Sequence, residues 1–137
     1  MTYDEWLATV PENLKRDSLW QFQVYPKAMF VYDLLWGDCE VMMKDVRGRA
    51  IAEQIILSGG SIGANVEEGF GRGFGAEFVY FLRVALGSAR ETRGWYYRAR
   101  RLLKPEVLAH RLDLLDEIVG VLVKSVDHQK QLSRRKR

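Results

Sequence analysis

Polar side chains, one of them a carboxylate that could act as an acid or base, recur along one predicted helix, over residues 46–69. At about 100° per residue they fall within roughly one-sixth of the helix circumference, beside its apolar face; they are Gln54, Ser61, Asn65 and Glu68. Catalysis would make Glu68 an acid or base, but no histidine, cysteine or lysine lies near it in sequence to complete a catalytic set. We therefore interpret the four residues as a polar ladder, a buried hydrogen-bond network that fixes helix or subunit register.

Residues of metal-binding and phosphate-binding type occur without the spacing that those sites need. His110 and His128 are eighteen residues apart on one predicted helix, and no cysteine accompanies them. Glu67 and Glu68 are adjacent on a helix and point apart, which argues against a shared cation. Glycines alternate through residues 69–75, but a phosphate-binding glycine run should follow a β-strand, and none precedes it. We expect no metal, no cofactor and no enzymatic activity.

Basic residues are concentrated in the second half of the chain. Residues 70–104 contain eight Lys/Arg and two Asp/Glu, whereas residues 1–69 contain six and eleven. On a predicted helix, Arg83, Arg90 and Arg101 project in nearly one direction, with Tyr97 and Lys104 alongside. Solvated faces usually mix charge signs, so this face favours contact with phosphates. The predicted nucleic-acid-binding residues are Arg83, Arg90, Arg93, Arg98, Arg100, Arg101, Lys104, Arg134, Arg135 and Arg137.

The elements that position these residues are expected to be helices. The chain has three prolines and lacks the alternating runs typical of strands. Thr2 and Glu5 have capping-box spacing and predict a short first helix. Long helices are predicted from Tyr25 to residues 43–46, over 46–69, over 76–103, and from Pro105 onward. Gly37 leaves a break in the first long helix open.

Apolar and small residues at helical spacing define the faces expected to turn inward. They are Val24, Ala28, Val31, Leu35, Cys39 and Met42; Ile51, Ile55, Ile62 and Val66; Phe78, Phe81, Ala85, Ala89, Thr92, Tyr96, Ala99 and Leu103; and Leu108, Leu112, Leu115, Val119, Leu122 and Val126. Four such helices predict an all-α, antiparallel up-down-up-down four-helix bundle over residues 1–132. The basic tail, 133–137, has no apolar residue to bury, so we expect it to be disordered.

Composition places this bundle in the cytoplasm and favours self-association. Cys39 is the only cysteine, which suits a reducing compartment. The N-terminus does not read as a signal peptide, and no apolar run approaches the ~20 residues that cross a bilayer. The aromatic residues Trp20, Phe22, Trp36, Trp95 and Tyr96 supply more surface than one core of this length readily hides. We therefore expect a homo-oligomer.

Two stretches of the chain carry a specific pattern. Residues 54–72 read QIILSGGSIGANVEEGFGR, and an EF pair at 77–78 is followed by FLRVALGSARE at 81–91. They resemble the bacterial four-helix-bundle proteins encoded in intervening sequences of large-subunit ribosomal RNA genes, whose pattern is close to QIRRAAxSIPANIAEGxGR followed by ExxxFLxIAxGSxxE. The VYPKA at 24–28 is similar to that family's VYQKA. The resemblance spans roughly residues 24–103 and implies a bundle.

Members of that family are similar in assembly to the accessory variability protein of diversity-generating retroelements. That protein is a homopentameric basic barrel that engages nucleic acid and a reverse transcriptase, so the resemblance implies a pentamer. This chain departs from the pattern at several positions: the family's paired arginines fall at Ile56 and Leu57, Gly63 replaces proline, and Glu67 replaces alanine. Basic charge is therefore lost from this helix, which leaves the following helix and the tail as the better nucleic-acid contacts.

The sequence thus predicts a non-enzymatic, homopentameric bundle that binds RNA or DNA phosphates through a basic face. The alternative is a protein-interaction scaffold, such as an accessory subunit of a reverse transcriptase or another nucleic-acid enzyme, whose acidic surface would meet the same basic face. We expect no membrane partner.

Overall fold

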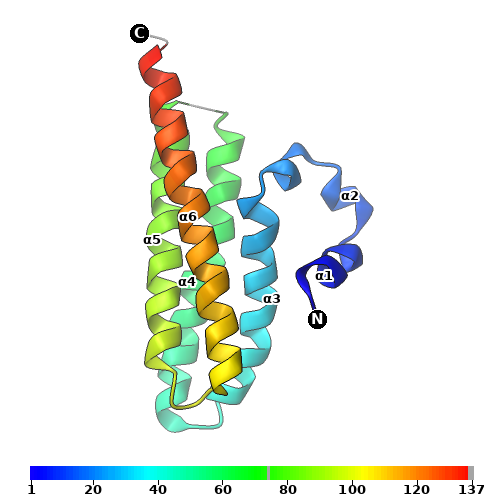
Figure 1. The fold of residues 1–137 in the computed structure, drawn as a ribbon, viewed down its shortest axis with the longest axis vertical. Helices are drawn as coiled ribbons and strands as arrows, with labels where there is room; N and C mark the ends of the chain where they lie inside the picture. The colour runs from blue at the N-terminus through cyan, green and yellow to red at the C-terminus, as the bar shows by residue number, and fades with distance from the viewer. Residues whose placement is uncertain (74, 136–137) are drawn as a thin grey trace.

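Four long helices lie side by side along the long axis of the protein in its computed structural model, which describes residues 1–73 and 75–135 (Figure 1). They are α3 (Val24–Met42), α4 (Val46–Gly71), α5 (Ala76–Arg98) and α6 (Pro105–Arg135). The colours in Figure 1 run down α3, up α4, down α5 and up α6. The N-terminal arm, residues 1–23, contains α1 (Tyr3–Thr9), α2 (Glu12–Lys15) and the 3₁₀ helix η1 (Ser18–Gln21). The prediction of an all-helical bundle is confirmed.

Helices α1, α4 and α6 begin where the sequence supplies a cap or a proline. The Thr2 hydroxyl accepts a hydrogen bond from the Glu5 amide at 3.1 Å, which caps α1 as the spacing predicted. The Asp45 carboxylate caps α4 and accepts from the amides of Arg47 and Gly48. Pro105 occupies the first position of α6, where its missing N–H has no helical partner to lose. Each start therefore follows from a residue at the boundary itself.

Helix ends follow the sequence less closely. α3 continues through Gly37 without a break, and α4 extends to Gly71, after which Gly73 and Gly75 adopt positive φ angles of 86° and 90°. α5 ends at Arg98, five residues before the predicted end at 103. The Ala99 amide is shared by the carbonyls of Trp95 and Tyr96 there, and the tightened turn that follows leads into α6.

The expected disorder of the tail is wrong for residues 133–135, because α6 continues to Arg135. These residues contain no glycine or proline, and cations at a helix C-terminus interact favourably with its dipole. Lys136 and Arg137 lie outside the described residues. The cationic tail thus begins as part of α6.

The predicted inward faces fill the core between the four helices. All six predicted residues of α3 are buried, as are Ile55, Ile62 and Val66 of α4. The exceptions are half-buried: Ile51, Phe81, Leu108 and Leu112. Glycine allows a close approach of α3 and α4, since a Cβ built on Gly59 would lie 2.3 Å from Cδ2 of the fully buried Leu35. The core therefore depends on small residues as much as on large ones.

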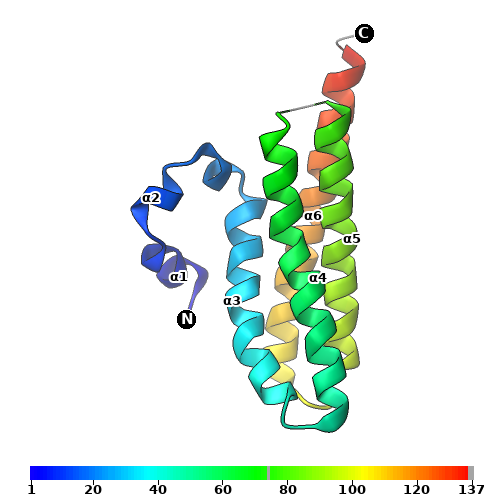
Figure 2. The same ribbon diagram turned by 180° about the vertical axis from the view of Figure 1, so that it is seen from behind.

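The N-terminal arm lies along the outer side of α3 (Figure 2). Trp6 is its anchor, because the ring packs beside Trp20 and Phe30 with centroids 6.4 and 5.4 Å away. The Trp6 Nε1–H donates to Oδ2 of Asp33 at 2.6 Å. Aromatic burial and one side-chain hydrogen bond thus hold the arm to the bundle.

In the described part of the chain, none of the helices combines the length and hydropathy that crossing a membrane requires.

Candidate nucleic-acid interface

The outer face of α5 carries exposed cations and aromatic rings. Arg83 and Arg90 are exposed, and neither has a carboxylate within 4.0 Å among the described residues. Tyr80 and Tyr97 are 61% and 56% exposed. The opposite face, with Ala85, Ala89, Thr92 and Tyr96, is buried. α5 therefore presents cations and π-surfaces to solvent and small residues to the core.

Arg101 and Lys104 lie beyond the end of α5, so the prediction of one continuous helical stripe with Arg83 and Arg90 is wrong for them. Both are exposed in the turn between α5 and α6. This turn and the turn between α3 and α4 are at the same end of the bundle (Figure 1). The two turns meet, since a Cβ on Gly48 would lie 2.8 Å from a methyl group of Leu102.

That end of the bundle gathers cations that sequence reasoning missed. Lys44, Arg47 and Arg49 come from the α3–α4 turn and the start of α4, and all three are exposed. Arg47 pairs with Asp45 at 3.0 Å, and the Arg49 Nε–H donates to the Met43 carbonyl. The signal that could have found them is topological, because alternating helix directions bring every second turn to one end. We name Lys44, Arg47, Arg49, Arg100, Arg101 and Lys104 the basic end.

The remaining predicted contacts do not form one surface with the basic end. Arg134 and Arg135 lie at the far end of α6, about 45 Å away along a helix of 31 residues (Figure 1). Arg137 lies outside the described residues. The structure thus separates the tail arginines from Arg101 and Lys104 by the length of the bundle.

Three arginines of the predicted set are held by neighbours. Arg93 Nη1 lies 3.1 Å from Oδ1 of Asp116 on α6. The guanidinium of Arg98 lies over the Trp95 ring, and that of Arg100 lies over the Tyr97 ring, each 4.5 Å from the centroid. These contacts orient the cations without neutralising Arg98 or Arg100, because an aromatic ring carries no net charge.

The polar ladder is present in part. Asn65 Nδ2 donates to the carbonyl oxygen and to Oγ of Ser61, and the Ser61 hydroxyl is 2.8 Å from that of Ser88 on α5. Gln54 is half-buried and contributes its backbone carbonyl, which accepts from the Ser58 hydroxyl. Glu68 is exposed and lies 3.7 Å from Arg72, so its placement in a buried network is wrong.

Hydroxyl groups that the sequence analysis did not connect complete this network between α4 and α5. Thr92 Oγ1 lies 2.9 Å from Ser58 Oγ and 2.7 Å from the Ser88 carbonyl oxygen. All buried side-chain nitrogen and oxygen atoms of the described residues have a hydrogen-bond partner. Serines and a threonine on facing small-residue surfaces are the signal that could have pointed to it, and their role is to fix the register of two closely packed helices.

A buried ion pair joins three helices and was not predicted. The Asp38 carboxylate on α3 receives Arg111 Nε at 2.7 Å and Nη2 at 3.1 Å from α6, and the Tyr96 hydroxyl at 2.7 Å from α5. Burial, with the nearby Asp38 charge, raises the pKa of Tyr96. Tyr96 and Arg111 follow Asp38 in the sequence by 58 and 73 positions. No local sequence pattern could have paired residues so far apart.

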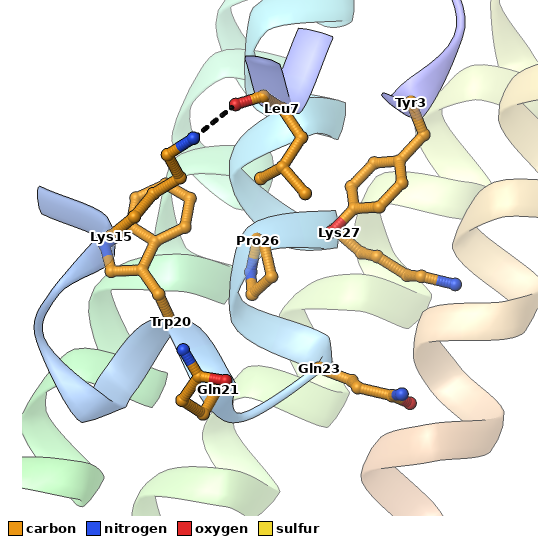
Figure 3. A pocket seen from close by; sticks show the side chains of 8 residues that line it. All are labelled: Tyr3, Leu7, Lys15, Trp20, Gln21, Gln23, Pro26 and Lys27. Carbon is orange, nitrogen blue, oxygen red and sulfur yellow. Dashed lines mark hydrogen bonds between the residues drawn. The ribbon is translucent and has the colours of Figure 1, made fainter. Parts of the chain in front are cut away.

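A pocket of about 520 Å³ lies between the N-terminal arm and α3 (Figure 3). Its lining contains no carboxylate, histidine or cysteine: Tyr3, Leu7, Lys15, Trp20, Gln21, Gln23, Pro26 and Lys27. Lys15 Nζ donates to the Leu7 carbonyl oxygen, the dashed line in Figure 3, and pairs with Glu12; Lys27 pairs with Glu117. Both amines are therefore occupied, and the pocket lacks an acid–base pair. Within the residues that the structure describes, no three His, Cys, Asp or Glu side chains gather as metal ligands.

These features define a class of protein: a helical bundle with a network of hydroxyl groups between its helices and an arginine-rich outer face. The chain belongs to the 23S rRNA-intervening sequence protein family, whose family model matches residues 21–124. Most of the N-terminal arm lies before the first residue of that match.

The structure is similar to a crystal structure, at 1.70 Å resolution, of a protein with unknown function from the S23 ribosomal protein family of Bacteroides thetaiotaomicron VPI-5482. The two sequences are 25% identical, and the match has a TM-score of 0.70 and covers 75% of this chain and 97% of that one. A search among curated proteins gave no match.

Proposed function

We propose that this antiparallel four-helix bundle is a non-enzymatic, homo-oligomeric nucleic-acid-binding protein. The outer face of α5 and the basic end contact RNA or DNA phosphates. The observation that carries the proposal is the group of exposed cations without a carboxylate partner among the described residues: Arg83, Arg90, Arg101 and Lys104. A phosphate that binds these four cations releases their counterions and displaces no ion pair within the protein. Binding therefore does not reduce the stability of the fold.

Self-association belongs to the same proposal, with the pentamer as the assembly that the family resemblance implies. Support comes from apolar surface on the α3–α4 side, where Trp36 and Leu57 are 59% and 61% exposed. Between these helices lies a groove of about 270 Å³ lined by Gly59, Gly60 and Gly63 together with Met29, Tyr32 and other residues. Exposed rings beside a glycine-lined groove are suited to helix packing from a second copy. Light scattering at micromolar concentration should give a multiple of 15.9 kDa, and a clean monomer mass would contradict this part.

The interface is tested by replacing Arg83, Arg90 and Arg101 with glutamine in one variant. Affinity for generic RNA or DNA should fall for all sequences, and the slope of log affinity against log salt should decrease by about two to three. Helicity and oligomer mass should not change, because these side chains are exposed. Replacing Arg16, Lys124 and Lys130 with glutamine removes the same charge elsewhere and should have a much smaller effect.

Replacing Arg134 and Arg135 with glutamine should weaken binding less than the triple variant, because they lie at the other end of the bundle. Unchanged binding by the triple variant, with its helicity verified by circular dichroism, would contradict the proposed surface. A flat salt response would favour the alternative, a protein-interaction scaffold or accessory subunit of a nucleic-acid enzyme such as a reverse transcriptase, in which the basic face meets an acidic surface of the protein partner.

A further inference from the structure

A groove of about 560 Å³ between α5 and α6 combines opposite charges with an aromatic ring. Its lining residues are Arg90, Arg93, Gly94, Tyr97, Leu112, Asp113 and Asp116. The volume lies in the range of about 300–1,000 Å³ that is typical of small-molecule sites. Gly94 adds no side chain and Leu112 is half-buried, so part of the lining is apolar. It lies directly beside the exposed Arg90 of the proposed interface.

The two carboxylates exclude a purely phosphate-binding role for this groove. Asp116 pairs with Arg93 at 3.1 Å, whereas Asp113 is exposed and has no side-chain partner among the described residues. A phosphate backbone that followed the groove would be repelled by Asp113. A ligand that fills the groove must therefore offer hydrogen-bond donors to Asp113 and place its negative charge near the arginines.

Tyr97 supplies a stacking surface for such a ligand. The Arg100 guanidinium covers one face of its ring at 4.5 Å, and the Arg100 Nη1 donates to the Tyr97 carbonyl oxygen. The ring is thereby supported from one side, and Tyr97 is 56% exposed as a residue and lines the groove. Aromatic side chains accessible to solvent can stack on unpaired nucleobases.

We propose that the groove binds an unpaired guanine of single-stranded nucleic acid, which deepens the proposed function and rests on it. The base stacks on Tyr97, and its adjacent N1–H and N2–H₂ groups donate to the two Asp113 oxygens. Guanine presents two neighbouring donors on its Watson–Crick edge, whereas uracil presents a single N–H between two carbonyl acceptors that the carboxylate repels. Arg90 and Arg93 then meet the phosphates on either side of the base. A paired base cannot enter, because its donor edge is already used in the duplex.

The probes are fluorescein-labelled RNA octamers: one of uridine only, one with two central guanosines, and the second annealed to its complement. Fluorescence anisotropy with the full chain should show about tenfold tighter binding of the guanosine octamer than of the uridine octamer, and weaker binding of the duplex. Replacing Tyr97 with alanine should weaken binding of both single strands by about 5- to 100-fold. The matched control is Tyr80→Ala, which removes a comparably exposed tyrosine of the same outer face but outside the groove; it should weaken binding less than Tyr97→Ala does and leave the preference for guanosine unchanged.

The substitution Asp113→Asn provides a readout that general charge effects do not reproduce. It removes a negative charge, so binding of the uridine octamer should stay the same or tighten. It also places an amide donor against a donor edge, so the preference for guanosine should fall to about one. Equal binding of both single strands by the wild type, or an unaffected Tyr97→Ala variant, would overturn this inference and leave the proposed function standing. Failure of all three probes to bind would overturn both.

Discussion

The two faces of α5 differ in the kind of side chain they carry and in how strictly each position is determined. Toward the core, Ala85, Ala89 and Tyr96 are fully buried and fit against α4 and α6. Toward solvent, Arg83 and Arg90 meet no carboxylate of the described chain. One face is fixed by contacts made within the protein, and the other carries Arg83 and Arg90 without a carboxylate partner among the described residues. Substitutions on the outer face of α5 are therefore expected to leave the packing of the bundle intact.

The inner face owes its specificity to a few polar contacts among many apolar ones. The Asp38 carboxylate orders three helices at one level, and the hydroxyls of Ser61, Ser88 and Thr92 match α4 to α5 at another. Substitutions of buried residues should therefore lower stability more when more hydrogen-bond partners lose their contact. Substitutions of exposed residues should change stability little.

Replacing Asp38 with alanine should have the largest effect on stability. It leaves the Arg111 charge, whose side chain is 15% exposed, and the buried Tyr96 hydroxyl without their partner. We expect a loss of about 3–5 kcal/mol in the free energy of unfolding, measured by urea denaturation at fixed protein concentration. The control is Glu40→Ala on the exposed side of α3, which should stay within about 0.5 kcal/mol. A loss below about 1 kcal/mol for Asp38→Ala would show that the ion pair is not formed as described.

Adding one methyl group should lower stability on the buried side of a helix and raise stability on the exposed side. In Gly59→Ala the new Cβ meets the fully buried Leu35, and we expect a destabilisation of about 1–3 kcal/mol. Gly87 lies on the exposed side of α5 with nothing within 4 Å of a built Cβ. Gly87→Ala should therefore stabilise the helix by about 0.5–1 kcal/mol. Thermal unfolding followed by circular dichroism measures both, and equal shifts would remove the distinction between the two faces.

Alanine substitutions at two members of the predicted polar ladder should likewise differ in their effect on stability. Asn65→Ala removes the donor that binds Ser61 at two oxygens, with an expected cost of about 1 kcal/mol. Glu68→Ala removes an exposed carboxylate 3.7 Å from Arg72 and should change stability by less than about 0.5 kcal/mol. If the Glu68 variant proves the less stable of the two in urea, Glu68 makes a contact in an assembly that the single chain lacks.

A smaller effect should appear at alkaline pH. Burial, with the nearby Asp38 charge, raises the pKa of the Cys39 thiol from 9.0 to about 11. The folded state therefore keeps its proton to higher pH than the unfolded state does, so this contribution to stability is complete below pH 9 and is lost as pH rises toward 11. The Cys39→Ala variant should lose stability less steeply between pH 9 and 11 than the wild type. Identical slopes would indicate that the thiol is not buried in the folded chain.

Local sequence patterns were sufficient where a structure depends on neighbouring residues. The cap at Thr2, the start of α6 at Pro105 and most of the apolar faces of the four helices were predicted, because each depends on residues within one or two turns. The same reasoning failed for Glu68, since a position beside an apolar face is at the edge of burial, and only the packing of the neighbouring helix decides whether it is covered.

The sequence by itself determined that this chain forms amphipathic helices with an acidic first half and a cationic segment around α5, because composition and helical periodicity are properties of the chain alone. Tertiary structure decided which charges meet. It paired Asp38 with Arg111, brought Lys44 and Arg49 to the same end as Arg101, and moved Arg134 and Arg135 to the other. It also set Asp113 and Asp116 opposite Arg90 and Tyr97 across a groove. These arrangements depend on helix direction, turn length and side-by-side packing, which bring together residues too far apart in sequence for any periodic pattern to relate.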